Sequence, residues 1–198
     1  MTSARTVSSV VVIAVVALSG CMAGSAPETV TSTFDDDTEG WTVVGDVEGG
    51  QTEPDHVPEG GSAGGYLEAT DDVAGGVWYW NASTAYLGDR SAYAGGTLTF
   101  DLRQSATDSQ FDATDVILAS GDTSLGYDFG NASTHPGTDW TRYEVDLSAD
   151  GWRTLDTGDA ATEDVFERVL SALDELRIRG EYREGGDTDG IDEVELAA

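Results

Sequence analysis

The 198-residue sequence contains no lysine, one cysteine, two histidines and two asparagines. A single cysteine excludes an intrachain disulfide framework. Nine arginines stand against 38 acidic residues, so the chain has no basic patch that could neutralise the phosphates of nucleic acid or an anionic membrane surface. We therefore do not expect nucleic acid as a partner.

The acidic excess is spread along the whole sequence and gives a net charge of -29. Self-repulsion at this density destabilises a compact state at low ionic strength. At 1 M salt the Debye length falls to about 3 Å, and the repulsion is screened. Acidic chains without lysine resemble proteins of extremely halophilic archaea. The alternative is an acidic surface protein of a mesophile.

The N-terminus carries the features of a secretory signal. Arg5 is the only charged side chain before the apolar segment Val10–Leu18, which is too short to span a membrane. Small residues precede Cys21, as in bacterial and archaeal lipoboxes, where the signal peptide is cut before a cysteine that is then lipidated. We expect residues 1–20 to be a lipoprotein signal peptide, with an ordinary signal peptide as the alternative.

The expected domain organisation follows from this signal. Cys21 would anchor the mature chain by its lipid to the extracellular face of the cell membrane, and residues 21–33, which are small and polar, would form the tether. Residues 34–198 are long enough for one domain with a substantial core.

Period-two alternation of apolar and polar residues indicates strands with one buried and one wet face. It is clearest in Thr97–Arg103 and Trp140–Leu147, and it recurs around Leu176–Arg179 and Glu193–Leu196. Further strand candidates are 40–44, 65–68, 77–80, 115–118 and 124–127. Joints rich in glycine, aspartate and serine separate these segments, as expected for an all-β sandwich.

One segment has helical periodicity instead. Residues 162–173 place Val165, Phe166, Val169 and Leu170 on one face, and Thr162 is positioned as an N-cap. We predict one short amphipathic helix packed against the sandwich.

A series of motifs then points to a family. They are WYWNAS at 78–83, YLGD at 86–89, YAGG at 93–96, DVIL at 115–118, Trp140, IRGEY at 178–182 and DTDGIDEVEL at 187–196. In this order they resemble the laminin B domain, also called laminin IV type A, over Phe34–Leu196. The resemblance implies an extracellular jelly-roll β-sandwich, similar to carbohydrate-binding and galactose-binding modules. It does not imply a ligand.

The sequence gives little support for catalysis. His56 and His135 fall in expected loops, and no GxSxG or HExxH motif is present. Carboxylates are so frequent that no glycosidase-like pair stands out. We expect a protein that is not an enzyme.

Calcium is the best chemical hypothesis, as one structural Ca²⁺ between the first and last strands. Calcium takes several oxygen ligands, and the candidates are Asp35, Asp37, Asp187, Asp189 and Asp192. Asp192 shares parity with Val194 and Leu196, so we expect it to point inward, where a buried carboxylate needs a partner. Solvated acidic loops are the alternative.

Two further features concern glycans. Trp78, Tyr79 and Trp80 could stack on a sugar ring, although core packing is the favoured interpretation of such large aromatic side chains. Asn81 and Asn131, the only asparagines, both lie in N-glycosylation sequons. Asn131 lies in an expected loop and is the better acceptor.

The sequence thus predicts a lipid-anchored, non-enzymatic binding or adhesion module at the cell surface, whose partners include the membrane and either a glycan or a surface-layer protein. The first alternative is a carbohydrate-binding module that captures polysaccharide. The second is a hydrolase accessory domain or degenerate hydrolase.

Overall fold

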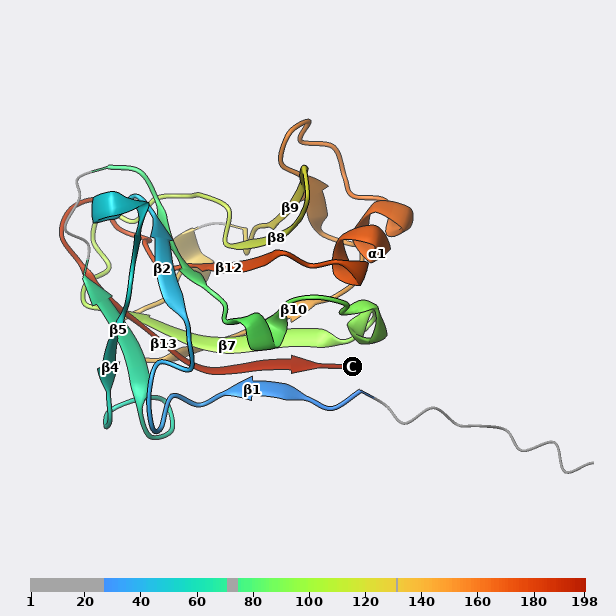
Figure 1. The fold of residues 1–198 in the computed structure, drawn as a ribbon. Coiled ribbons are helices and arrows are strands. Elements are labelled where there is room, and N and C mark those ends of the chain that lie inside the picture. The colour runs from blue at the N-terminus through green and yellow to red at the C-terminus, as the bar shows by residue number, and fades with distance from the viewer. Residues whose placement is uncertain (1–26, 71–74, 131) are drawn as a thin grey trace, which may run out of the picture.

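The computed structural model describes residues 27–70, 75–130 and 132–198. The chain forms a jelly-roll sandwich of two antiparallel sheets (Figure 1). Sheet A contains β1 (Val30–Ser32), β4 (Asp55–Val57), β5 (Tyr66–Thr70), β7 (Thr97–Gln104), β10 (Thr141–Asp146) and β13 (Thr188–Ala197). Sheet B contains β2 (Thr42–Gly45), β3 (Gln51–Thr52), β6 (Trp78–Asn81), β8 (Val116–Ser120), β9 (Thr123–Tyr127), β11 (Trp152–Thr154) and β12 (Glu175–Arg179).

The strand order explains how the ends of the chain meet. Sheet A runs β10-β7-β13-β5-β4, with β1 also beside β13, and sheet B runs β11-β9-β8-β12-β6-β2-β3. The first half of β13 pairs with β5, and the second half pairs with β1. The last strand is therefore enclosed by β1, β5 and β7, which come much earlier in the chain, and these long-range pairings hold the sheet together.

The alternation in the sequence determines which side chains enter the core. Leu98, Phe100 and Leu102 of β7 and Tyr143 and Val145 of β10 are buried. Sheet B contributes the following side chains to the same core: Val43, Trp78, Trp80, Val116, Leu118, Leu125, Leu176 and Ile178. The alternating strands predicted from the sequence are thus confirmed, with their apolar faces inside.

Helix α1 (Glu163–Ser171) covers one end of the sandwich, next to β8 and β9 (Figure 1). Thr162 is its N-cap, and its hydroxyl accepts a hydrogen bond from the N–H of Val165 at 3.4 Å. Phe166 packs against Trp152 with ring centroids 5.5 Å apart, while Val169 and Leu170 are also buried. The predicted helix is confirmed, with its amphipathic face against the core. No helix in the described residues is long and apolar enough to cross a membrane.

A β-bulge in β13 changes which face its residues occupy. Ile191 pairs with Leu102 and Asp192 with Asp101, but the register then shifts before Glu195 pairs with Thr99. The bulge includes Glu193, which has a positive φ of 47°. Asp192 is fully buried, as expected, but the bulge places it on the outer face of sheet A. The prediction that it points inward with Val194 and Leu196 is therefore wrong.

Two placements also differ from the prediction. Val30–Ser32 pairs with β13 as strand β1, so the sandwich includes residues before Phe34, inside the segment expected to be the tether. His56 lies in strand β4 rather than in a loop, and its Nε2 is 2.8 Å from the carbonyl oxygen of Phe34. The expected signal peptide, Cys21 and the sequon residue Asn131 lie outside the described residues.

Candidate functional site

The aromatic cluster around Trp78 belongs to the core. Trp78 and Trp80 are fully buried and meet edge to face, with ring centroids 5.0 Å apart. A Cβ at Gly180 would overlap the Trp78 ring, so the neighbouring IRGEY segment is fitted closely around this indole. Neither side chain can reach a ligand, and the structure contradicts the proposal that they stack on a sugar. Tyr79 lies half-buried on the outer face of sheet B.

A different aromatic cluster lies on the outer face of sheet A. It consists of Tyr66, Glu68, Arg103 and Trp140, and we call it the aromatic–arginine face. The Arg103 guanidinium carbon is 4.4 Å from the centroid of the Tyr66 ring and 4.9 Å from that of Trp140. The two rings meet edge to face at 5.4 Å. Arginine held between two aromatic rings is a favourable cation–π arrangement.

Strand register brings these residues together. Glu68 of β5, Gly190 of β13 and Arg103 of β7 lie side by side in three paired strands. Nη2 of Arg103 donates to the Tyr66 hydroxyl at 2.6 Å and lies 3.6 Å from Oε2 of Glu68. A Cβ at position 190 would be only 2.9 Å from Cη2 of Trp140, so glycine between the charged pair leaves room for the indole.

Next to this face is a hollow of 210 Å³. Its lining is polar and consists of Glu68, Arg103, Gln104, Ser105, Thr138 and Thr188. Ser105 and Thr138 are exposed, and Arg103 belongs both to the hollow and to the aromatic–arginine face. The surface therefore offers an indole, a donor–acceptor pair and several hydroxyl groups within one region.

The β4–β5 loop, residues 58–65, folds over the outer face of sheet A and positions Trp140. The indole Nε1 of Trp140 donates to the carbonyl of Gly60 at 3.1 Å. The Ser62 hydroxyl donates to Asp101, and the N–H of Ala63 donates to Oδ2 of Asp192 at 3.1 Å. Two buried carboxylates therefore fix the loop, and the loop fixes the indole.

The electrostatics of these two carboxylates differ. Asp101 faces Arg142, whose Nη1 is 3.4 Å from Oδ1. Burial raises the pKa of Asp192 to about 6, although the N–H groups of Ala63 and Glu193 stabilise its charged form. Burial also raises the pKa of Glu193. Among the described residues, no cation pairs with Asp192 in the way that Arg142 pairs with Asp101. A cation bound beside the buried Asp192 carboxylate would therefore stabilise the fold.

The five carboxylates expected to bind calcium do not form one site. Asp189 shares the face of Ile191, whereas Asp192 is on the opposite face of β13. Asp187 is buried beside Ser105, whose N–H and hydroxyl both donate to its Oδ1, and Asp37 lies on an exposed turn. Within the described ranges, no three His, Cys, Asp or Glu side chains are grouped closely enough to hold a metal ion by themselves.

Asp35 and Asp192 nevertheless approach the same loop. Oδ1 of Asp35 accepts from the N–H of Gly65 at 3.3 Å. A Cβ on Gly61 would collide with the Gly65 carbonyl oxygen and with Oδ2 of Asp192, and the Gly64 carbonyl oxygen would lie 3.0 Å away. Main-chain and carboxylate oxygens thus converge beside Gly61, and this oxygen-rich donor set fits calcium chemistry.

A second group of buried charged residues, Arg179 and Asp115, lies at sheet B, where Arg179 pairs with Tyr79 in the strand register. Arg179 is fully buried, lies 3.5 Å from Oδ1 of Asp115, and contacts the ring of Tyr182 at 4.2 Å. Burial raises the pKa of Asp115, against the opposing effects of the Phe129 N–H and Arg179. Since Arg179 and Tyr182 belong to the IRGEY motif, this motif forms a structural network.

A hollow of 310 Å³ adjoins this network and includes His135. Burial lowers the pKa of His135, and its Nε2 is 3.2 Å from Oδ1 of Asp112. The imidazole also contacts Tyr182, with ring centroids 5.2 Å apart. Among the described residues that line this hollow, Thr114 is the one with a hydroxyl group, and this hydroxyl accepts a hydrogen bond from Nη2 of Arg153 at 2.8 Å. It does not form the hydroxyl–imidazole pair with His135 that acyl transfer would use.

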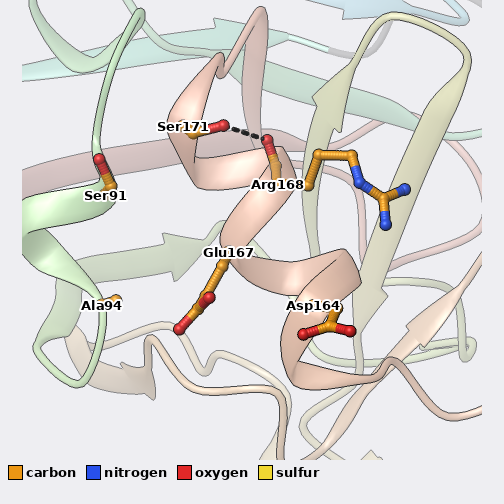
Figure 2. A pocket seen from close by; sticks show the side chains of 6 residues that line it. All are labelled: Ser91, Ala94, Asp164, Glu167, Arg168 and Ser171. Atoms are coloured by element: carbon orange, nitrogen blue, oxygen red, sulfur yellow. Dashed lines mark hydrogen bonds between the residues drawn. The ribbon is translucent and has the colours of Figure 1, made fainter.

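Another hollow, of 660 Å³, lies between α1 and the turn of η3 (Ser91–Tyr93) (Figure 2). In Figure 2 the side chain of Arg168 extends away from Ser91 and Ala94, and the Ser171 hydroxyl donates to the Arg168 carbonyl at 2.8 Å. Asp164 and Glu167 are exposed. All six side chains that line this hollow are exposed to solvent.

Asn81, the sequon residue that the structure describes, lies half-buried on the outer face of sheet B. Its Nδ2 donates to the Thr42 hydroxyl at 3.2 Å. The nitrogen that would carry a glycan therefore already has a structural partner. Glycosylation of Asn81 and of Asn131 stays a prediction.

Trp140 and Arg103 are functional candidates that the sequence reasoning did not identify. One signal was present, because Trp140 shares parity with Arg142 and Glu144, which placed it on the wet face of its strand. The partners Tyr66 and Glu68 come from a strand far earlier in the chain, and no local pattern links them to Trp140.

Comparisons with known proteins agree on the architecture. The family described as Laminin B (Domain IV) matches residues 79–198. The basement membrane proteoglycan of Caenorhabditis elegans is 25% identical over 114 residues, which are 58% of this chain and 3% of the proteoglycan. The L4b domain of human laminin alpha-2 matches with a TM-score of 0.67 and 14% identity, over 86% of this chain and 98% of that domain.

A family 11 carbohydrate-binding module of Clostridium thermocellum also matches, with a TM-score of 0.47 and 16% identity over 86% of each chain. The laminin L4b match confirms the β-sandwich fold expected from the sequence.

Proposed function

Because this chain belongs to the Laminin B (Domain IV) family, we propose that it is a non-enzymatic binding module, presented outside the cell from a lipid on Cys21. The family match confirms the resemblance seen in the sequence, and one relative is the basement membrane proteoglycan of Caenorhabditis elegans. The binding surface in this proposal is the aromatic–arginine face.

The observation that carries the proposal is the position of Trp140. The other four tryptophans are at most 2% exposed, and Trp140 alone is half-buried. It is held by a hydrogen bond to Gly60 and by the contact with Arg103. A large aromatic side chain fixed at the surface beside paired charges is typical of a binding site rather than of a core.

The absence of catalysis is part of this proposal. Asp101 and Asp192 are two desolvated carboxylates that converge, which is the arrangement a hydrolase would need. They are covered by the 58–65 loop, whose donors occupy them, instead of facing a cleft. This supports a binding role.

The location is tested in the native host with the full chain and a Cys21→Ser variant. We expect the unaltered chain in the membrane fraction and degraded by protease added to intact cells. The serine variant should appear in the medium. Recovery of the unaltered chain in the soluble cytoplasmic fraction would refute the surface location, and equal membrane association of both proteins would refute the lipid anchor. The binding role is tested by attachment of cells to surfaces after deletion of the gene and after its restoration.

A structural Ca²⁺ held by Asp192, with Asp35 and the carbonyls of Gly64 and Gly65, is also proposed. Bound there, calcium would supply the positive charge that the buried Asp192 lacks. Thermal melting in Ca²⁺ and in EGTA tests the idea. We expect a higher Tm in Ca²⁺ for the unaltered chain and no difference for Asp192→Asn. No calcium effect on the unaltered chain would refute the site.

A further inference from the structure

We infer that the aromatic–arginine face binds an uncharged sugar chain, with one ring against Trp140 and its hydroxyl groups on Arg103 and Glu68. This inference rests on the proposed binding function and adds the class of ligand.

The position of Trp140 is fixed before any ligand arrives. Its Nε1 donates to Gly60, its ring edge meets Tyr66, and its Cη2 lies over Gly190, where a Cβ would be 2.9 Å away. Three separate contacts to three segments of the chain hold a ring that is still partly exposed. Preorganisation of this kind lowers the entropy cost of binding. A flat apolar surface matches the C–H face of a sugar ring.

The charges beside the indole provide the polar half of the site. Arg103 is 30% exposed and Glu68 is 32% exposed, and their closest charged atoms are 3.6 Å apart. A guanidinium next to a carboxylate offers donors and acceptors side by side, as adjacent hydroxyl groups of a sugar require. Because the pair is neutral in sum, it does not select for a charged ligand.

The surroundings argue against an anionic sugar. Glu144 and Asp146 of β10 are exposed on the same outer face of sheet A, and the whole chain carries a net charge of -29. An anionic chain would be repelled here, at least at low salt. An uncharged chain would not be repelled.

The adjoining hollow defines the size of the ligand. Its volume of 210 Å³ is below the roughly 300–1,000 Å³ of sites that enclose a whole small molecule. Ser105, Thr138 and Thr188 place hydroxyl groups along it. A shallow polar hollow next to a fixed indole fits a sugar chain that lies across the surface and places one sugar unit in the hollow.

The test is affinity electrophoresis of the full chain, purified in detergent, through gels containing galactomannan, laminarin or dextran. Heparin and alginate serve as anionic comparisons. We expect at least one neutral polysaccharide to retard the protein and both anionic ones to leave it unretarded. Trp140→Ala should weaken the retardation at least tenfold, and Arg103→Gln should also weaken it. Trp140→Phe, which keeps a ring, should retain part of the binding.

Tyr79→Ala is the matched control, because Tyr79 is a half-buried aromatic on the opposite outer face. It should bind like the unaltered chain. Circular dichroism and Tm must show that each variant is folded.

The inference is overturned if no neutral polysaccharide retards the unaltered chain, if only anionic polysaccharides do so, or if folded Trp140→Ala binds normally. Because the cell-attachment experiment does not depend on purified sugars, a positive result there with no retardation would reject the sugar and keep the binding function.

Discussion

Asp192 lies directly opposite Asp101 in the register of β13 and β7, and the 58–65 loop covers both carboxylates. Asp192 is 0% exposed and Asp101 is 5% exposed, and each side chain accepts a hydrogen bond from this loop. The same loop holds Trp140 through Gly60. The two buried acids therefore support the surface aromatic from beneath.

The pKa of Asp192 makes stability depend on pH. In calcium-free buffer its folded pKa of about 6 exceeds the ordinary value of 3.8, so the folded state binds more protons in this interval. The contribution to stability is complete below about pH 4 and is lost as pH rises through about 6. One pKa unit is worth about 1.4 kcal/mol, so the change is at most about 3 kcal/mol.

Urea unfolding of the unaltered chain and of Asp192→Asn in EGTA measures this effect. The difference in unfolding free energy between the two proteins should change with pH through this window, because the variant lacks the titrating group. A constant difference from about pH 4 to about pH 7 would contradict the raised pKa.

The buried pair of Arg179 and Asp115 gives a second prediction. Arg179→Met should lower the unfolding free energy by about 3–5 kcal/mol, because it leaves Asp115 buried without its cation. Adding Asp115→Asn removes that charge, and the double variant should recover about 1–3 kcal/mol. If the loss of unfolding free energy in the double variant equals the sum of the losses in the two single variants, the ion pair does not stabilise the network as described.

Close packing around Trp78 gives a third prediction. Gly180→Ala should lower the unfolding free energy by about 3 kcal/mol, because the new Cβ would overlap the fully buried indole of Trp78. Gly137→Ala is the control, since the nearest atom to its Cβ is the Asp139 nitrogen at 3.9 Å. Equal stability of the two variants would show that Trp78 is not confined.

Salt dependence follows from the net charge of -29. Raising NaCl from about 0.1 M to about 1 M shortens the Debye length from about 10 Å to about 3 Å. The Tm measured by circular dichroism should rise over this range because repulsion between surface carboxylates is screened. A Tm that is constant or falls with NaCl would argue against adaptation to high salt.

The strands that were predictable from the sequence are those with long alternation. Thr97–Arg103 and the segment after Trp140 each contain at least three apolar residues on one parity, and both are strands. Helix α1 was predictable because its apolar residues repeat at helical spacing and because Thr162 precedes it as an N-cap. Strands β3 and β11 are two and three residues long and too short to show alternation.

The site was less predictable, for two physical reasons. The bulge at Glu193 reverses the parity of β13, so alternation misplaced Asp192. Alternation in WYWN separates Trp78 and Trp80 from Tyr79 but does not say which face is buried. The aromatic–arginine face depends on register between β5, β13 and β7, which only the folded sheet defines.

The most direct test of the binding role follows the five indole N–H signals of the full chain by NMR during addition of galactomannan, laminarin or dextran fragments. The Trp140 signal should shift with at least one of these sugars, because its ring is at the surface. The signals of Trp41, Trp78, Trp80 and Trp152 should stay in place, because these side chains are buried. A Trp140 signal that is unchanged by all three sugars would contradict the binding site.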